Sequence, residues 1–212
     1  MGRRTGLPTG PNTHLLYDMS CRSLALVLAV AAAACGGRST PAGPAPAPAP
    51  VTDAPPVFVP IPDASTLAIV RMANNVELAY AIIAARRATA SSVKTLVRRE
   101  RTSHTALNAS IERIADVIGV EPTEGDVSRL LRDQSLPRRD SLRVLSGRRF
   151  DSAYVDLEIR SHRELLVAID SVFLRSVQHP ALESYLTDSL RPAVSAHLAQ
   201  AERLQSTLAP RQ

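Results

Sequence analysis

Apolar residues recur at helical spacing in the part of the chain that follows residue 62. A first stripe starts at Asp63 or Ser65, and we expect one of these side chains to cap the helix. A second stripe starts at Ser91–Ser92, which offers the same capping chemistry, and ends at Gly119, where glycine is expected to stop the helix. Two helices joined by a few residues around Thr89 are therefore predicted.

The C-terminal half of the pattern predicts a second pair of helices. The third helix begins at Asp151, which we expect to cap it while Phe150 packs against its first turn. Pro180 suits the first turn of a fourth helix, which continues to about Leu208. Pro192 lies inside this helix and is expected to kink or divide it, because proline cannot donate a backbone hydrogen bond.

The lengths of the connections favour one topology. Only a few residues separate the helices within each pair, so each pair is expected to form an antiparallel hairpin. Between the pairs, Gly119 to Gly147 show only short helical patterns such as "DVSRLLRD". The expected fold class is all-α: a ferritin-like four-helix bundle over residues 63–208, in which one long crossover joins two hairpins.

Ionisable side chains occupy core positions of the predicted helices. Glutamate and histidine stand four residues apart on the second helix and again on the third, in phase with the apolar stripe both times. A histidine is in phase on the fourth helix, and a glutamate flanks the stripe of the first. In chain order these residues are Glu77, Glu100, His104, Glu158, His162 and His197.

Four of these residues are expected at one depth of the bundle, because members of a hairpin that are equidistant from its turn lie side by side. Buried charges must be paired, hydrogen-bonded or bound to a metal. Mixed nitrogen and oxygen donors suit iron, zinc or copper, and the sequence does not choose among these metals. A buried hydrogen-bond network is the alternative, since Glu–His pairs four residues apart also stabilise helices. The candidate metal ligands are Glu77, His104, His162 and His197, with Glu100 and Glu158 as weaker candidates.

The first 62 residues differ in composition. Residues 1–34 resemble a signal peptide with the apolar segment Leu24–Ala34, and Met19 is a second candidate start. "AAAC" resembles a bacterial lipobox that would lipidate Cys35, although Ala32 stands where leucine is usual; a cleaved secretory signal is the alternative. Residues 35–62 continue as a Pro- and Ala-rich linker that is expected to be disordered. We expect a lipid anchor in a membrane of the bacterial envelope, with the domain facing the periplasm.

Composition argues against several other classes of protein. The 212 residues include no Trp and carry a formal net charge of +5, but basic residues alternate with acidic ones and do not interleave with aromatics, so no nucleic acid is expected as a partner. Cys21 would leave with the signal, so no disulfide is expected. Neither Ser nor Cys is arranged with His for nucleophilic catalysis, and a binding or interaction protein is expected rather than an enzyme. No protein partner is indicated.

Four segments carry a resemblance to a known family. They are Glu77, "VK" ahead of His104, "FDSAYVDLEIRSH" ending at His162 and "LRPAVSAHLAQAERL" around His197. These segments resemble the domain of unknown function 4142, a family of bacterial envelope proteins, and the resemblance implies a ferritin-like bundle at the outer membrane. Glu100 and Ser103 depart from the family pattern, which usually has an apolar and an acidic residue there. The Glu-x-x-x-His spacing also differs from the Glu-x-x-His of di-iron proteins, so no ferroxidase activity is inferred.

Overall fold

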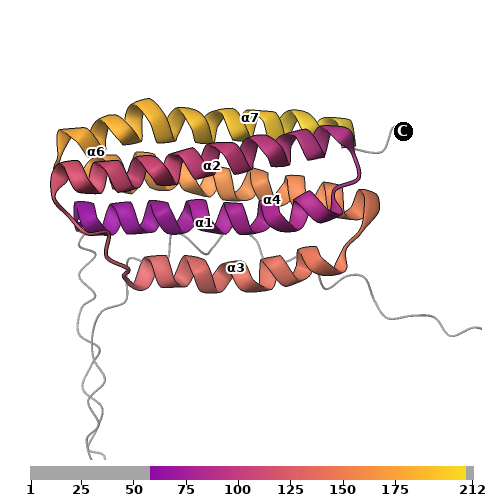
Figure 1. Cartoon of the computed structure of the whole chain (residues 1–212), viewed down its shortest axis with the longest axis horizontal. Helices are drawn as coiled ribbons and strands as arrows, with labels where there is room; N and C mark the ends of the chain where they lie inside the picture. The colour runs from indigo at the N-terminus through magenta and orange to yellow at the C-terminus, as the bar shows by residue number, and fades with distance from the viewer. Residues whose placement is uncertain (1–57, 209–212) are drawn as a thin grey trace, which may run out of the picture. The chain divides into compact units, whose positions relative to one another are not determined.

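The structure, a computed structural model, describes residues 58–208, and every regular element in this range is a helix (Figure 1). The predicted signal peptide, Cys35 and linker residues 36–57 lie outside the described residues. Residues 58–62 precede the first helix without regular structure. The long helices are α1 (Asp63–Arg87), α2 (Ser91–Ile118), α3 (Asp126–Val144), α4 (Gly147–Ala168) and α7 (Arg191–Leu208).

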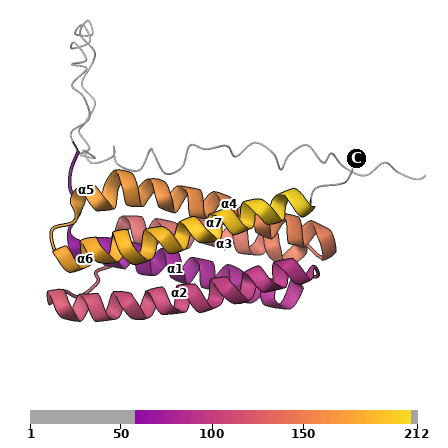
Figure 2. The ribbon, with the colours of Figure 1, turned by 90° about the horizontal axis from the view of Figure 1, so that it is seen from above.

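Four of these helices form the predicted bundle. α1 and α2 make one antiparallel hairpin, α4 and α7 make the other, and α3 lies in the crossover between them. α1 also contacts α4, and α2 contacts α7, so each helix has a neighbour in the other hairpin. The two hairpins lie alongside one another in the view of Figure 2. The predicted all-α, ferritin-like wiring is confirmed.

The crossover contains more helix than the sequence pattern indicated. The expectation of short helical pieces between Gly119 and Gly147 was wrong, because α3 is a single helix of 19 residues that packs along α1 (Figure 1). It continues through the exposed Pro137. Proline costs the helix one backbone hydrogen bond, but packing against α1 outweighs this loss. Gly119 ends α2 as predicted, in the left-handed conformation with φ of 68°.

The second hairpin contains two wider helical turns. α4 continues into a π-helical segment, η2 (Ile169–Phe173), and then into the short α5 (Leu174–Ser176). After the turn, α6 (Pro180–Ser184) begins with Pro180 as predicted and leads through a second π-helical segment, η3 (Tyr185–Leu190), into α7. The boundary between η3 and α7 falls next to Pro192, and the backbone remains helical there, so the change from wider to ordinary turns replaces the predicted division.

Two aspartates expected to cap their own helices instead hold the turn of the opposite hairpin. Pro62 is the N-cap of α1, and both oxygens of Asp63 accept from the backbone N–H groups of Gln178 and His179, each at 3.0 Å. α4 begins at Gly147, so Asp151 lies inside the helix. Its carboxylate accepts from the N–H groups of Thr89 and Ala90 at 3.0 and 2.9 Å, respectively. Both capping predictions were therefore wrong.

The start of the second helix also differs from the prediction. The N-cap of α2 is Ala90, and neither Ser91 nor Ser92 provides a side-chain cap. Asp151 of the neighbouring hairpin instead binds the backbone N–H groups of Thr89 and Ala90, directly before the first residue of the helix. Tertiary contacts thus replace local capping at this end of the bundle.

The apolar core is divided into two clusters by a polar layer. One cluster surrounds the turn between α1 and α2 and includes Tyr80, Leu96 and Phe150. The other lies toward the opposite end of the bundle and includes Leu67 and Leu186. Seven buried polar residues lie between these clusters along the helices: Asn74, Glu77, Glu100, His104, Glu158, His162 and His197. The layer is where the bundle departs from an ordinary apolar core.

α1 is the one helix among the described residues that is long and apolar enough to cross a membrane. Half of its most apolar window is buried inside the bundle. It also places Asn74 and Glu77 in the polar layer and packs against α2, α3 and α4. These contacts are those of the central helix of a folded domain.

Candidate metal centre

Four side chains from three helices converge within the polar layer. Glu100 and His104 come from α2, His162 from α4 and His197 from α7. All four are buried, and one ligand atom of each lies within 4.8 Å of those of the other three. Glu100 and His104 share a face because four residues make about one helical turn. The hairpin pairing of α4 with α7 brings the remaining two histidines to the same depth.

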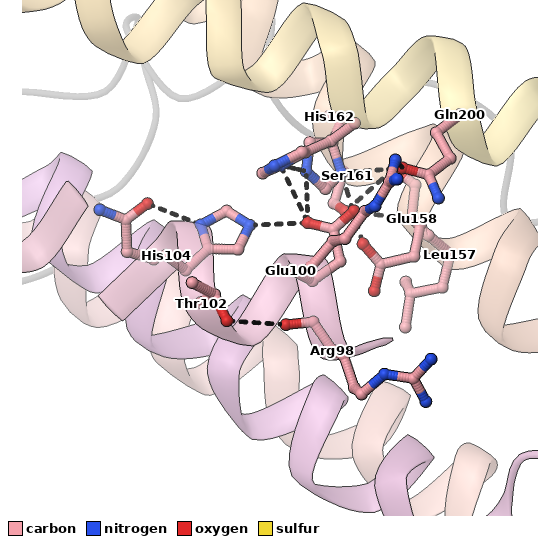
Figure 3. A network of polar contacts seen from close by, with 12 residues as sticks. Arg98, Glu100, Thr102, His104, Leu157, Glu158, Ser161, His162 and Gln200 are labelled. Atoms are coloured by element: carbon pink, nitrogen blue, oxygen red, sulfur yellow. Dashed lines mark hydrogen bonds and ion pairs between the residues drawn. The ribbon is translucent and has the colours of Figure 1, made fainter. Parts of the chain in front are cut away.

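The carboxylate of Glu100 lies at the middle of this group. Its Oε2 atom is 2.9 Å from Nδ1 of His197, 3.2 Å from Nε2 of His104 and 3.6 Å from Nε2 of His162. Figure 3 shows the carboxylate pointing toward the histidine rings. The three rings surround it, with centroid separations between 5.2 and 5.7 Å. The centre therefore offers three ring nitrogens and one carboxylate.

In His104 and His162, the ring nitrogen that points away from Glu100 makes a hydrogen bond. This bond determines which nitrogen of each ring carries the proton. Nδ1 of His104 lies 3.0 Å from the side-chain oxygen of Asn74, and Nδ1 of His162 lies 2.8 Å from the backbone carbonyl oxygen of Glu158. A carbonyl oxygen can only accept, so we assign the ring protons to Nδ1 in both residues. The Nε2 lone pairs of His104 and His162 then face Glu100, as metal ligation requires.

Burial and mutual contacts set the charges of the group. Burial raises the pKa of Glu100, but the close approach of His104 and His197 and the positive charge that the neighbouring rings carry when protonated outweigh it and lower this pKa to about 2. Burial lowers the pKa of His104 and lowers that of His162 to about 4. At neutral pH the centre thus holds a carboxylate anion with neutral His104 and His162. Neutral imidazole and ionised carboxylate are the forms that bind zinc, iron or copper.

A second polar group lies directly beside the first. Glu77 on α1 and Glu158 on α4 each place a carboxylate oxygen within 4.8 Å of the other and of a nitrogen of His162. Burial raises the pKa of Glu77 to about 8 and raises that of Glu158 well above its usual range. Tyr154, one turn before Glu158, is fully buried, and both burial and the neighbouring carboxylate raise its pKa.

The structure distributes the predicted ligands between these two groups. His104, His162 and His197 meet as their distances from the turns suggested, but the fourth member of their group is Glu100. Glu77 lies in the adjacent group with Glu158, although it was expected among the main four. Distance from a turn fixes the depth of a residue in the bundle, whereas its direction depends on the rotation of the helix. Glu100 also lies one turn from His104, which places the two side chains together.

Two contributors were missed from the sequence. Asn74 is fully buried, and its side-chain oxygen contacts His104. Its Nδ2 atom donates a second hydrogen bond, of 3.0 Å, to the side-chain oxygen of Asn108. Asn74 lies three residues before Glu77, on the same face, and this spacing was the available signal. Tyr154 was not among the candidate residues named from the sequence. Its ring stacks on Phe150, with centroids 6.1 Å apart, while its position also places it beside Glu158.

The fold and its buried layer define an all-helical bundle protein with an internal Glu/His cluster. The model of the domain of unknown function DUF4142 matches residues 46–204, and the chain belongs to this family. Among solved structures, the fold is similar to the DUF305 fragment from Deinococcus radiodurans, with a TM-score of 0.59 and 14% sequence identity over 70% of this chain and 98% of that one. This similarity concerns the fold alone. No curated protein matches the chain.

Proposed function

We propose that the bundle binds a transition-metal ion through Glu100, His104, His162 and His197. The observation that carries this proposal is the convergence of four buried donor atoms within 4.8 Å. Two of the histidines present an acceptor nitrogen to the centre and hold their second nitrogen by a hydrogen bond, which is the usual arrangement around a bound metal. A donor set of three imidazoles and a carboxylate suits zinc, copper or iron.

A buried hydrogen-bond network is the competing function of the same layer. It is favoured by the contact of 3.3 Å between Nε2 of His162 and Nδ1 of His197. A network that exists for core specificity should satisfy its buried polar atoms. Both oxygens of Glu100 and Nε2 of His104 are buried without a hydrogen bond of good geometry, although they lie within ion-pair distance of one another. These atoms favour metal binding over the network.

Elemental analysis of the full chain, purified without an affinity His tag, tests the proposal. We expect at least one equivalent of zinc, copper or iron in the wild type and a sharp loss in His104→Ala and Glu100→Gln. His179→Ala is the matched control, because His179 is exposed and its imidazole binds only the backbone N–H of Ala181 in its own turn. Chelator-treated protein that takes up neither Zn²⁺, Cu²⁺ nor Fe²⁺ on titration would refute metal binding.

We further propose that the domain is anchored in the bacterial envelope, on the periplasmic side of the outer membrane. The support is the sequence of the N-terminal region: the apolar segment Leu24–Ala34, the lipobox-like Cys35 and the Pro-rich linker that follows. Replacing Cys35 by Ala should abolish incorporation of labelled fatty acid and release the protein from the membrane fraction. Retention of label in this variant would contradict the proposal.

A further inference from the structure

The second polar group contains two buried carboxyl groups that form no ion pair with a lysine or arginine in the part of the chain that the structure describes. Glu77 is 6% exposed and Glu158 is 1% exposed, and they come from different helices that meet in the core. Among residues 58–208, no Lys or Arg makes an ion pair with either carboxylate. Two such groups are stable inside a protein when they are neutralised by a proton or a cation.

Several oxygen atoms of this group could ligate a metal and make no hydrogen bond of good geometry with any residue that the structure describes. Both oxygens of Glu158 and Oε2 of Glu77 are buried without a hydrogen-bond partner. The hydroxyl of Tyr154, one turn before Glu158, is also buried without a hydrogen bond of good geometry, although it lies near the carboxyl group of Glu158. A buried polar atom that stays unpaired costs about 1–3 kcal/mol, and here several lie together. Their concentration indicates a ligand position.

The imidazole of His162 connects this position with the first one. Its Nε2 faces Glu100 at 3.6 Å, and its Nδ1 lies 3.5 Å from Oε2 of Glu158. The two nitrogens of one ring therefore face two different carboxylates. Figure 3 shows Glu100 and Glu158 close to each other near His162. Glu77 completes the set on the side of α1, with one oxygen within 4.8 Å of an oxygen of Glu158 and of a ring nitrogen of His162.

From this arrangement we infer that Glu77, Glu158 and Nδ1 of His162 bind a second divalent transition-metal ion, linked to the first through the imidazole. This inference rests on the proposed function, because the first ion is the one held by Glu100 and the three histidines. Nδ1 now donates its proton to the backbone carbonyl of Glu158 at 2.8 Å. On binding, the ion takes the place of that proton, and the proton leaves to solvent together with any carried by the two carboxyl groups.

The stoichiometry of Zn²⁺ binding to the chelator-treated full chain tests the second position. We expect two equivalents for the wild type and one for the double variant Glu77→Gln/Glu158→Gln, which keeps side-chain volume and removes both anions. Glu164→Gln is the control on the same helix, because Glu164 makes only a distant ion pair at the surface, and it should retain two equivalents. The equivalent retained by the double variant also shows that it is folded.

Cu²⁺ provides a second readout, since two copper ions that share an imidazole are magnetically coupled. We expect a weakened electron paramagnetic resonance signal for the wild type with two equivalents and an uncoupled signal for the double variant with one. A wild type that binds a single ion, or two uncoupled ions, would overturn the second position and leave the proposed function intact. A wild type that binds no ion would remove both.

Discussion

The side-chain oxygen of Asn74 lies 3.0 Å from Nδ1 of His104 and fixes which nitrogen of that ring faces Glu100. Asn74 is fully buried on α1, whereas His104 belongs to α2, so one hairpin orients its own ligand across the helix interface. Partners of this kind hold the ring in place and set its tautomer.

Loss of this hydrogen bond is expected to weaken metal binding. Asn74→Leu keeps most of the volume but removes the acceptor, and we expect Zn²⁺ affinity to fall about 10- to 100-fold. Competition with a chromophoric chelator measures the change. Asn75→Ala is the adjacent control, since Asn75 is exposed and does not contact His104, and its affinity should equal that of the wild type. Unchanged affinity in a folded Asn74→Leu variant would remove the positioning role of Asn74.

The buried Glu77 is expected to make the metal-free protein less stable as pH rises. Burial raises its pKa from 4.5 to about 8, so between these values the folded protein holds a proton that the unfolded chain has lost. Its stabilising contribution is complete below pH 4.5 and disappears as pH rises through 8. From pH 5 to pH 8 the wild type should lose roughly 2–4 kcal/mol relative to Glu77→Gln.

Urea unfolding of chelator-treated protein at the two pH values measures this difference. Glu112→Gln serves as the control, because Glu112 is exposed and pairs only with Arg71 at the surface. Its stability should follow that of the wild type at both pH values. A constant difference between wild type and Glu77→Gln would mean that Glu77 titrates normally in the folded protein.

Asp151 is expected to contribute strongly to stability although it is remote from the metal centre. It is buried and accepts hydrogen bonds from the backbone of Thr89 and Ala90, and Asp151→Ala leaves these donors without their charged partner. We expect a loss of about 2–4 kcal/mol in the free energy of unfolding. Asp156→Ala on the same helix breaks only an exposed contact with Gln205 and should cost less than about 0.5 kcal/mol. Equal effects of the two variants would contradict the tertiary role of Asp151.

Pro137 is expected to limit the stability of α3. It is exposed inside the helix and cannot donate to the carbonyl one turn earlier. Pro137→Ala should restore that bond, and after the greater freedom of the unfolded chain is subtracted we expect a gain of about 1–2 kcal/mol. Thermal unfolding compares it with Leu136→Ala, an exposed neighbour whose replacement should have little effect. Destabilisation by Pro137→Ala would show that the proline serves the packing of α3 on α1.

The bundle helices and some of their ends, such as Gly119 and Pro180, could be predicted from the sequence, but the partners of Asp63 and Asp151 could not. Periodicity of apolar residues depends only on which face is buried, so the four bundle helices and their pairing follow from spacing and loop length. Capping by Asp63 and Asp151 looked local, but each carboxylate reaches a turn more than 60 residues away. The length of α3 could not be predicted either, because the segment contains a proline and is mostly polar. Packing on α1 nevertheless stabilises it as one helix.

The sequence predicts how far along the bundle each candidate side chain lies, but only partly in which direction the side chain points. His104, His162 and His197 could be placed at one level because hairpin partners are symmetric about their turn. From the sequence, Glu77 was the stronger candidate ligand and Glu100 the weaker one. In the structure Glu100 lies with the three histidines, whereas the rotation of α1 about its axis places Glu77 beside Glu158. That rotation is set by how α1 packs simultaneously on three other helices, which one sequence does not specify.

The reciprocal contacts of Asp63 and Asp151 also bear on how the molecule assembles. Each hairpin carries the residue that completes the loop of its counterpart, at opposite poles of the bundle. Recognition between the halves is thus encoded in both of them and does not depend on the covalent connection through residues 119–147. Two fragments divided just after Gly119 retain both sets of complementary contacts, so the native arrangement is expected to re-form by association of separate pieces.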